Sequence, residues 1–352
     1  MRLGIGIRLF ATGLLTLTLA LSPGSFGIPA LTDGTGWLNS NPLASRDLQG
    51  KVVLVDFWEY TCINCLRTLP YLRTWYKRYH DDGLVIVGVH TPEFNFSGEE
   101  QNVAAATRRL GIGWPVVLDS NSEIWRRFGT DAWPTEYLFD QEGRLVETFS
   151  GEGKYQETES KIQSLLKAQN SKLVFPPVMA LLPQDNYTKP GAVCYLHTPE
   201  VILDRTKIAN AGASDDRKRD STYTDTAAKH ADGGIYLQGI WRMPDQGEVF
   251  AGGSGYLDMR YHAIQVVGVL ASPNGKAVRV DVTQDGAPIA KRDAGSDIHY
   301  DADGTSYVTV SASRAYELAM NAKMGFHDLR LTPKLAGLGV YSFAFESCEA
   351  TT

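Results

Sequence analysis

The sequence lacks an excess of positive charge and a long apolar run. Its 352 residues carry a formal net charge of −6, and no basic patch is interleaved with aromatic side chains. These two properties argue against a nucleic-acid partner. The one apolar run near the start, residues 9–21, is short for a helix that must cross the hydrocarbon core of a bilayer. A membrane-spanning helix is therefore not the simplest reading of this run.

The same run fits the apolar region of a signal peptide. Arg2 and Arg8 flank its start, and residues 25–27 offer small side chains at the offset where cleavage occurs. We expect residues 1–27 to be a signal peptide, with an uncleaved anchor as the alternative. The folded part is then expected in the periplasm or another extracytoplasmic space.

Cysteine is scarce, with four residues in the whole chain, but its placement is informative. Cys62 and Cys65 lie two residues apart, directly after the apolar and β-branched run of residues 52–57. If this run is a strand that a short loop connects to a helix, Cys62 lies near the N-terminus of that helix, where the macrodipole favours a thiolate. Cys65, one turn further on, can resolve a mixed disulfide. The pair therefore predicts thiol–disulfide exchange.

The residues around this pair resemble those of thioredoxin-like proteins. Asp56, six residues before Cys62, stands where that family carries the buried acid that takes the proton of the second cysteine. Pro70 matches the proline that kinks the active-site helix, and residues 133–135 match the loop with a cis-proline that meets the substrate chain. The resemblance implies these site residues: Cys62, Cys65, Asp56 and Pro134 in catalysis, and Trp58, Trp133 and Thr135 in substrate binding.

Two positions depart from the thioredoxin pattern. Thr61 stands where many thioredoxins carry tryptophan, and Ile63 and Asn64 replace Gly-Pro between the cysteines. The intervening dipeptide tunes the reduction potential, so the motif leaves the direction of electron flow open. We expect reduction of client disulfides, because Tlp-like relatives mostly work in that direction; oxidation of client thiols would use the same residues. No cofactor is expected beyond the redox-active disulfide of Cys62 and Cys65.

Periodicity predicts an α/β thioredoxin-like fold over residues 28–170. Three strands and a hairpin alternate with three helices, and the βαβαβ part is richer than in minimal thioredoxin. Tlp-type and peroxiredoxin-type relatives carry such an insertion. The predicted strands are residues 52–57, 84–90, 116–118, 137–139 and 145–149, and the predicted helices are residues 65–80, 99–110 and 157–169.

The chain is too long for one such domain, so a second is expected. Residues 171–190 contain prolines and read as a linker. Residues 191–352 show short alternating segments between turn signals, which favours an all-β sandwich or jelly roll. The polar segment 209–232 is expected to be a long exposed loop. The predicted strands are residues 235–243, 256–270, 277–284, 305–310, 327–332 and 339–345.

The order of domains resembles the periplasmic part of DipZ-type proteins, in which a Tlp-like domain precedes a β-rich domain similar to carbohydrate-binding modules. The phrases TCINC (61–65), GVHTPEF (88–94), WPTEYL (133–138) and GEGKY (151–155) carry this likeness. In that family a multi-helix membrane electron carrier usually comes first. The resemblance therefore implies a separate CcdA-like or DsbD-like membrane donor, disulfide-bearing client proteins and a possible glycan as partners.

The other two cysteines, Cys194 and Cys348, flank the predicted β strands. Cysteines of an exported protein are counted in pairs, and the terminal strands of a sandwich often lie side by side. We therefore expect a structural disulfide between them, with two separate buried thiols as the alternative.

Two other signals have plain interpretations. The spacing of Cys194 and His197 occurs in zinc sites, but structural zinc normally takes four ligands and no second local pair follows, so no metal is expected. His90 and Glu93 follow a central strand, where we expect them to cap a loop; a place beside the active site is the alternative.

Two rival functions belong to different classes. A thiol peroxidase of the peroxiredoxin kind carries proline and threonine before its attacking cysteine, but Val55 and Glu59 stand at those positions. A glycan-binding or envelope-binding protein, in which the β domain carries the main function, needs exposed aromatic side chains. Aromatic residues in strands are more often part of the core. The candidates for a sugar-stacking platform are Tyr236, Trp241, Tyr256, Tyr261 and Tyr300.

Overall fold

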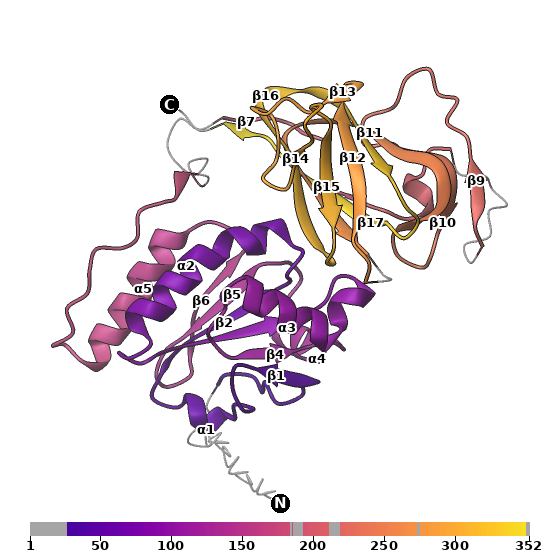
Figure 1. Ribbon diagram of the computed structural model, residues 1–352. Coiled ribbons are helices and arrows are strands. Elements are labelled where there is room, and N and C mark those ends of the chain that lie inside the picture. Colours follow the sequence, from indigo (N-terminus) through magenta and orange to yellow (C-terminus); the bar gives the residue numbers. More distant parts are fainter. Residues whose placement is uncertain (1–26, 184, 186–192, 211–218, 273–274, 350–352) are drawn as a thin grey trace, which may run out of the picture.

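The computed structural model describes residues 27–183, 185, 193–210, 219–272 and 275–349 (Figure 1). An α/β domain comes first in the chain, and a β domain follows it and lies against one of its ends (Figure 1). The predicted leader, residues 1–27, lies outside the described residues apart from its last position. None of the helices in the described part is long and apolar enough to cross a membrane.

The α/β domain has a six-stranded sheet in the order β1-β4-β3-β2-β5-β6. Strands β2, β3 and β4 run parallel, whereas β1, β5 and β6 pair antiparallel to their neighbours. Its elements are β1 (Gly36–Leu38), α1 (Ser45–Leu48), β2 (Val52–Trp58), α2 (Ile63–Tyr79), β3 (Leu84–His90), η1 (Asn95–Gly98), α3 (Glu100–Arg109), β4 (Val116–Leu118), α4 (Glu123–Phe128), β5 (Thr135–Phe139), β6 (Leu145–Ser150) and α5 (Tyr155–Gln169).

Strand β2 is buried along its whole length because helices cover both faces of the sheet. Its alternate residues serve two separate cores, as the two-residue period of a strand requires. Val52, Leu54 and Trp58 pack toward α2, α3 and α5, while Val53 and Phe57 pack toward α1 and α4. Asp56 falls on the first of these faces, and this alternation points it toward α2.

The segment that follows α5 packs against the domain it leaves. Phe175 lies edge-on to Tyr79 with ring centroids 5.2 Å apart, and the Met179 amide donates to Glu159 at 2.6 Å. Further along, the Tyr71 hydroxyl donates to Asp185 at 2.6 Å. The predicted linker thus forms a strap along α2 and α5, although its last residues, 186–190, lie outside the described residues.

The β domain is antiparallel, and one ten-stranded sheet and one two-stranded sheet make it up. This confirms the all-β prediction for the second half of the chain. Its elements are β7 (Val193–Cys194), β8 (Val201–Ile202), η3 (Arg205–Lys207), β9 (Ser221–Tyr223), β10 (Ile235–Arg242), β11 (Glu248–Ala271), β12 (Val278–Gln284), β13 (Ala287–Pro288), β14 (His299–Tyr300), β15 (Ser306–Val310), β16 (Arg314–Pro333), β17 (Gly339–Glu346) and β18 (Cys348–Glu349).

Two long strands, β11 and β16, organise the large sheet. They pair antiparallel over most of their length, and β17 pairs with both ends of β11: Val340 meets Glu248 at one end and Leu270 at the other. The sheet therefore curls around one hydrophobic core to which strands from β8 to β17 contribute (Figure 1). Trp241, Phe250 and Phe343 are among its largest fully buried side chains.

The structure corrects two predictions for the β domain. β16 begins at Arg314, 13 residues before the predicted start at His327, and pairs with β11 from there. The polar segment 209–232 is not an exposed loop throughout, because β9 pairs with β10 and buries Tyr223 to 4% exposure. A tight turn joins β12 to β13, with Asp285 and Gly286 both at positive φ, as such a hairpin requires.

Candidate active site between the two domains

The cysteine pair lies at the junction between β2 and α2. Cys62 is the N-cap of α2, and its Sγ accepts a hydrogen bond from the Cys65 amide at 3.3 Å. The two sulfur atoms lie 2.7 Å apart as free thiols. Cys62 is partly exposed, whereas Cys65 is 1% exposed. Cys62 is therefore the accessible cysteine of the pair, and Cys65 is buried.

Asp56 is a buried acid on the face of β2 that packs toward α2. It is 1% exposed, and neither carboxyl oxygen has a hydrogen-bond partner among the described residues. Burial raises the pKa of Asp56 to about 7. Burial also raises the pKa of the Cys65 thiol, and the charge of Asp56 adds to that rise. Asp56 is thus a buried carboxyl group whose charge acts on the Cys65 thiol and whose protonation changes near neutral pH.

A second buried acid, Glu136, stands beside Asp56 and was missed by the sequence analysis. Asp56 in β2 pairs directly with Glu136 in β5, so the two side chains are neighbours on one face of the sheet. Burial raises the pKa of Glu136 well above its ordinary value, and the charge of Asp56 raises it further. The signal in the sequence was a glutamate inside an otherwise apolar strand, two residues after Pro134.

A third buried acid, Glu59, holds the loop before the cysteines. Its Oε2 accepts hydrogen bonds from the Thr61 amide at 2.6 Å, from the Cys62 amide at 3.1 Å and from the Thr61 hydroxyl. Burial raises the pKa of Glu59, and these bonds oppose the rise. Glu59 stands at the position that is threonine in peroxiredoxins. In this protein it holds the backbone of Thr61 and Cys62 in place.

His90 and Glu93 do not share one role. His90 is the last residue of β3, 1% exposed, with Nε2 3.8 Å from Glu59 Oε1 and its ring stacked on Tyr60. Burial lowers the pKa of His90 to about 3, so this imidazole is neutral. Glu93 instead lines a cleft that contains Cys62. Glu93 thus has the position beside Cys62 that was the alternative prediction, and His90 packs beneath the loop that carries Cys62.

The predicted substrate loop carries a cis peptide bond between Trp133 and Pro134. Trp133 lines the cleft beside Cys62, and the Pro134 carbonyl accepts a hydrogen bond from Gly151 at 2.8 Å. The Thr135 side chain is buried and donates to the Ala132 carbonyl at 2.8 Å, so it shapes the loop. Trp58, for which substrate binding is predicted, is 1% exposed and packs within the core.

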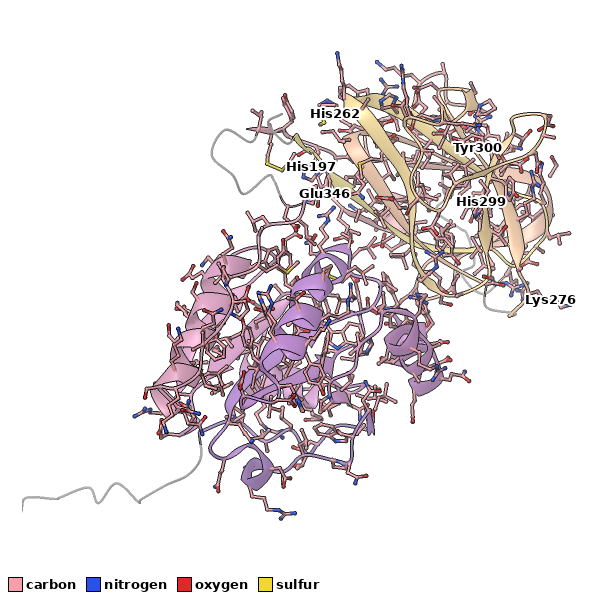
Figure 2. The ribbon with its side chains drawn as sticks, turned by 60° about the vertical axis from the view of Figure 1, so that its left-hand side comes forward. His197, His262, Lys276, His299, Tyr300 and Glu346 are labelled. Carbon is pink, nitrogen blue, oxygen red and sulfur yellow. A yellow bond between two sulfur atoms is a disulfide. The ribbon has the colours of Figure 1, made fainter. Side chains whose placement is uncertain are left out.

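The β domain forms the other side of the active site. A cleft of about 340 Å³ lies between the domains and is lined by Cys62, Trp133 and Glu93 on one side. Glu200 and Phe345, with their neighbours, line it from the β domain. In Figure 2, His197 and Glu346, which also line the cleft, lie at the edge of the β domain that faces the α/β domain. Cys62 therefore opens into a cleft beneath β17.

Two sets of contacts hold the domains together around this cleft. Arg67 of α2 donates to Glu346 at 2.7 Å and to Gln265 at 2.5 Å, and its side chain is 12% exposed. Elsewhere along the interface, the Phe96 ring lies edge-on to Tyr341 of β17 with centroids 4.6 Å apart. These contacts come from the same helix and the same loop region that frame Cys62, so domain docking and site geometry are coupled.

Cys194 and Cys348 form a disulfide with an S–S distance of 2.03 Å. They are directly opposed in the short pair of β7 and β18, as expected from their places before the first and after the last strand. Because the Cys194 sulfur is bonded, the spacing from Cys194 to His197 marks no zinc site. His197 lines the cleft instead.

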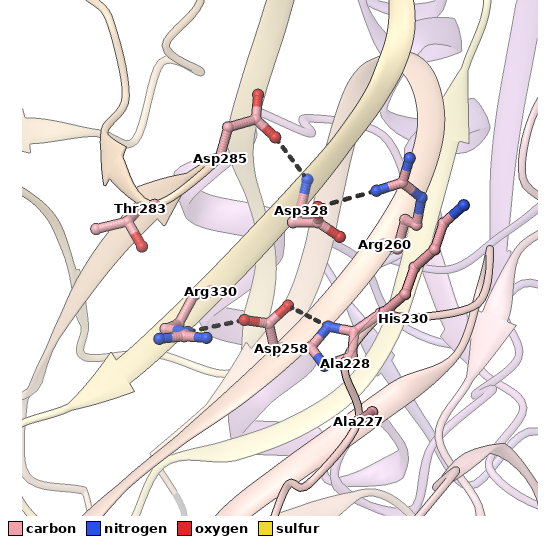
Figure 3. A pocket seen from close by; sticks show the side chains of 11 residues that line it. Ala227, Ala228, His230, Asp258, Arg260, Thr283, Asp285, Asp328 and Arg330 are labelled. Carbon is pink, nitrogen blue, oxygen red and sulfur yellow. Dashed lines mark hydrogen bonds and ion pairs between the residues drawn. The ribbon is translucent and has the colours of Figure 1, made fainter.

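A second pocket, of about 410 Å³, lies on the β domain (Figure 3). Asp258 accepts from Arg330 at 2.7 Å and contacts His230 at 3.0 Å, while Arg260 donates to Asp328 at 3.0 Å. His230, Asp258 and Asp328 place three possible metal ligands within 4.8 Å of one another. The arginines already neutralise both carboxylates, so the cluster presents a charge-balanced polar surface.

The predicted sugar-stacking platform is not present. Trp241 and Tyr261 are fully buried, because they lie on the inward face of their strands. Tyr236 stacks on His230 with centroids 3.9 Å apart, and Arg330 covers the ring of Tyr256. Trp241 and Tyr261 therefore belong to the core, while Tyr236 and Tyr256 pack against His230 and Arg330, which line the polar pocket.

The CxxC pair at the start of a helix, the buried aspartate and the adjoining cis-proline define a thioredoxin-like dithiol domain. Residues 27–166 match the Redoxin family model, and residues 198–345 match the model of the thioredoxin like C-terminal domain. The first of these matches falls on the α/β domain and the second on the β domain. It is 35% identical to protein DipZ of Mycobacterium tuberculosis over 263 residues, which are 74% of this chain and 36% of DipZ. It spans about a third of the length of that relative.

Other relatives match the first domain. Thiol-disulfide oxidoreductase ResA of Bacillus anthracis is 28% identical over 130 residues, which are 37% of this chain and 70% of ResA. Among solved structures, a putative thiol:disulfide interchange protein DsbE from Chlorobium tepidum matches with a TM-score of 0.33 and 21% identity, over 35% of this chain and 86% of that one.

Proposed function

We propose that this protein is an extracytoplasmic thiol–disulfide oxidoreductase that reduces disulfides of envelope proteins. The observation that carries the proposal is the asymmetry of the cysteine pair. Cys62 opens into a cleft, Cys65 is buried behind it, and Asp56 supplies a proton acceptor on the buried side. Similarity to DipZ and ResA supports the same chemistry.

The reaction begins at Cys62. Its thiolate attacks one sulfur of a client disulfide, a bond forms between the two sulfurs, and the client's own S–S bond breaks. The released client sulfur keeps the electron pair and takes up a proton. Hydrogen bonds from the Cys65 amide to Cys62 Sγ, and from the Cys62 amide to Glu59, hold the attacking residue in place.

Cys65 completes the reaction. Asp56 accepts the Cys65 proton, and the resulting thiolate attacks Cys62 Sγ, so that the Cys62–Cys65 disulfide forms and the second client thiol is released. The protein has then given two electrons to the client. Renewed reduction outside the cytoplasm needs a donor in the membrane, which we propose is CcdA-like or DsbD-like. The Cys194–Cys348 disulfide is consistent with an oxidising compartment.

The equilibrium reduction potential of the Cys62–Cys65 pair tests this proposal. It is measured by thiol labelling and mass spectrometry in glutathione and dithiothreitol buffers, with Cys62→Ser as the control that cannot form the disulfide. A value well below about −200 mV supports a reductase, and a value near −120 mV indicates an oxidase of client thiols. A reductase also reduces insulin, and the Cys62→Ser variant is then inactive.

A second function is supported by the pocket in Figure 3. Its volume of about 410 Å³ falls in the range of small-ligand sites, and its carboxylates, guanidinium groups and imidazole provide the donors and acceptors that hydroxyl groups bind. We propose a glycan or another polyol of the envelope as its ligand class. A glycan array with the wild type and Arg330→Ala tests this, and an array without hits leaves the β domain as the cover of the active site.

A further inference from the structure

The cleft beside Cys62 contains two carboxyl groups, and its described lining includes no lysine or arginine beside them. Glu93, which follows β3, and Glu200, which precedes β8, both line it. Neither carboxylate forms an ion pair with a lysine or arginine among the described residues. Burial, and then the charge of Glu200, raise the pKa of Glu93 to about 8. Two carboxyl groups from different domains thus line the cleft beside Cys62, and the charge of Glu200 disfavours ionisation of Glu93.

The other charged and titratable side chains of the cleft have partners within the protein. Glu346 binds Arg67 at 2.7 Å, and His197 Nδ1 lies 2.8 Å from the Thr198 carbonyl. The wall contributed by β11 and β17 is largely apolar, with Val267 and Phe345 among its residues. The cleft therefore has a nucleophile, an apolar wall and an acidic end that lacks a cation.

We infer that this cleft binds an extended polypeptide segment whose cysteine is flanked by a lysine or an arginine. The inference rests on the proposed function and names its substrate class. A cationic side chain between Glu93 and Glu200 favours the ionised form of both carboxyl groups and supplies the missing ion pair. The apolar wall accommodates the other side chains of the segment.

The size of the cleft selects an extended segment over a folded surface. A space of about 340 Å³ enclosed by Trp133 and Phe345 holds only a few side chains. The contacts of Arg67 with Glu346 and Gln265 keep the β domain over Cys62. A disulfide on the rigid face of a folded protein cannot reach Cys62 while these contacts persist.

Three peptides of equal length test the inference. Each is unstructured and carries one cysteine in a disulfide with thionitrobenzoate, and the residue beside the cysteine is Arg, Gln or Glu. The prereduced protein supplies both electrons: Cys62 attacks, Cys65 resolves, and one coloured thiolate and one peptide thiol are released for each Cys62–Cys65 disulfide formed. The rate constant is divided by that of dithiothreitol with the same peptide, which removes differences in intrinsic reactivity.

We expect the normalised rates to fall in the order Arg, Gln, Glu. The ratio of Arg to Glu should be about tenfold at low ionic strength, as for attraction and repulsion at partly exposed charges, and should shrink as salt is added. In the Glu93→Gln/Glu200→Gln variant the ratio should approach one. Glu200→Lys should favour the Glu peptide. Glu142→Gln, at the opposite end of β5 from Pro134, should keep the wild-type ratio.

Equal normalised rates in the wild type overturn the inference, and so does a ratio that survives in the double variant. In both cases reduction of all three peptides, abolished by Cys62→Ser, leaves the proposed function standing. A protein that reduces none of the peptides and no insulin overturns the proposed function together with the inference.

Discussion

Asp56 is a side chain whose burial lowers the stability of the folded protein when its carboxyl group is ionised. Its pKa is about 7 in the folded protein and near 3.8 in an unfolded chain, because burial disfavours its charge. Between these values the folded state binds one proton more than the unfolded state, so stability falls as pH rises from about 4 to about 7. Above pH 7 the full loss, about 4 kcal/mol, remains.

Asp56→Asn should therefore stabilise the protein by about 2–4 kcal/mol at pH 8 and leave it nearly unchanged at pH 3. Urea unfolding at several pH values measures this. The same variant should slow the resolving attack of Cys65 by about a hundredfold, because its proton acceptor is gone. The mixed disulfide on Cys62 then accumulates and is detected by mass spectrometry. A variant no more stable than the wild type at pH 8 would show that Asp56 is not a buried charge.

Substitution of Glu59, in contrast to that of Asp56, should lower the stability of the folded protein. Glu59→Ala leaves the buried amides of Thr61 and Cys62 without their acceptor, and each unpaired buried donor costs about 1–3 kcal/mol. We expect a loss of about 2–5 kcal/mol in urea unfolding. Glu142→Ala, on an exposed turn, is the matched control and should change stability by less than about 0.5 kcal/mol. Equal effects of the two substitutions would contradict the role given to Glu59.

The contact between α2 and β17 depends on one arginine. Arg67 is 12% exposed and binds Glu152, Glu346 and Gln265, so Arg67→Ala leaves two carboxylates of the interface without their cation. We expect faster amide hydrogen exchange in β17 by about tenfold or more, with exchange in β2 unchanged. Arg46→Ala, at a side chain that is 83% exposed, is the control. Unchanged exchange in β17 would show that the aromatic contacts alone dock the domains.

The elements with strong local patterns were predictable from the sequence. β3 and β4 begin and end where periodicity placed them, because a continuous apolar run between turn residues marks a buried strand. Helix α4 was missed, since its six residues are too short for a period and its first turn depends on Asp119. That carboxylate accepts from the Ile124 and Trp125 amides, at 2.9 Å in each case. The cap therefore comes from a residue four positions before the helix, whereas the N-cap residue itself, Ser122, makes no side-chain cap, so the usual capping pattern does not mark this start.

The residues of the candidate site also fall into two groups: those that a local sequence pattern predicts and those that only the fold brings together. Cys62, Cys65 and Pro134 were found because their spacing is a property of one short segment or of one loop. Glu136 was not found, because only the register between β2 and β5 brings it beside Asp56. The acidic cleft was equally hidden, since Glu93 and Glu200 come together only when the β domain docks. Pairings across domains are invisible to patterns read along one chain.

The Cys194–Cys348 bond joins the first and last strands of the β domain across 154 residues. In the chain-entropy model, closing a loop of that length stabilises the domain by about 5 kcal/mol. The Cys194→Ser/Cys348→Ser variant should therefore lower the unfolding midpoint of the β domain, while α2 and the Cys62–Cys65 pair keep their own transition. Calorimetry of the full chain resolves the two. A single substitution is the less suitable test, because it leaves a free thiol.

Because β17 lies over Cys62, the stage of folding at which a client disulfide can reach Cys62 is limited. Under the proposed function, a disulfide must still lie on a loose stretch of chain to enter the cleft, and it leaves the reach of the enzyme once the client has folded around it. Bonds made early and wrongly are then open to repair, while those locked into finished proteins are spared. Under this proposal, the folding state of the client decides which of its disulfides the protein reduces.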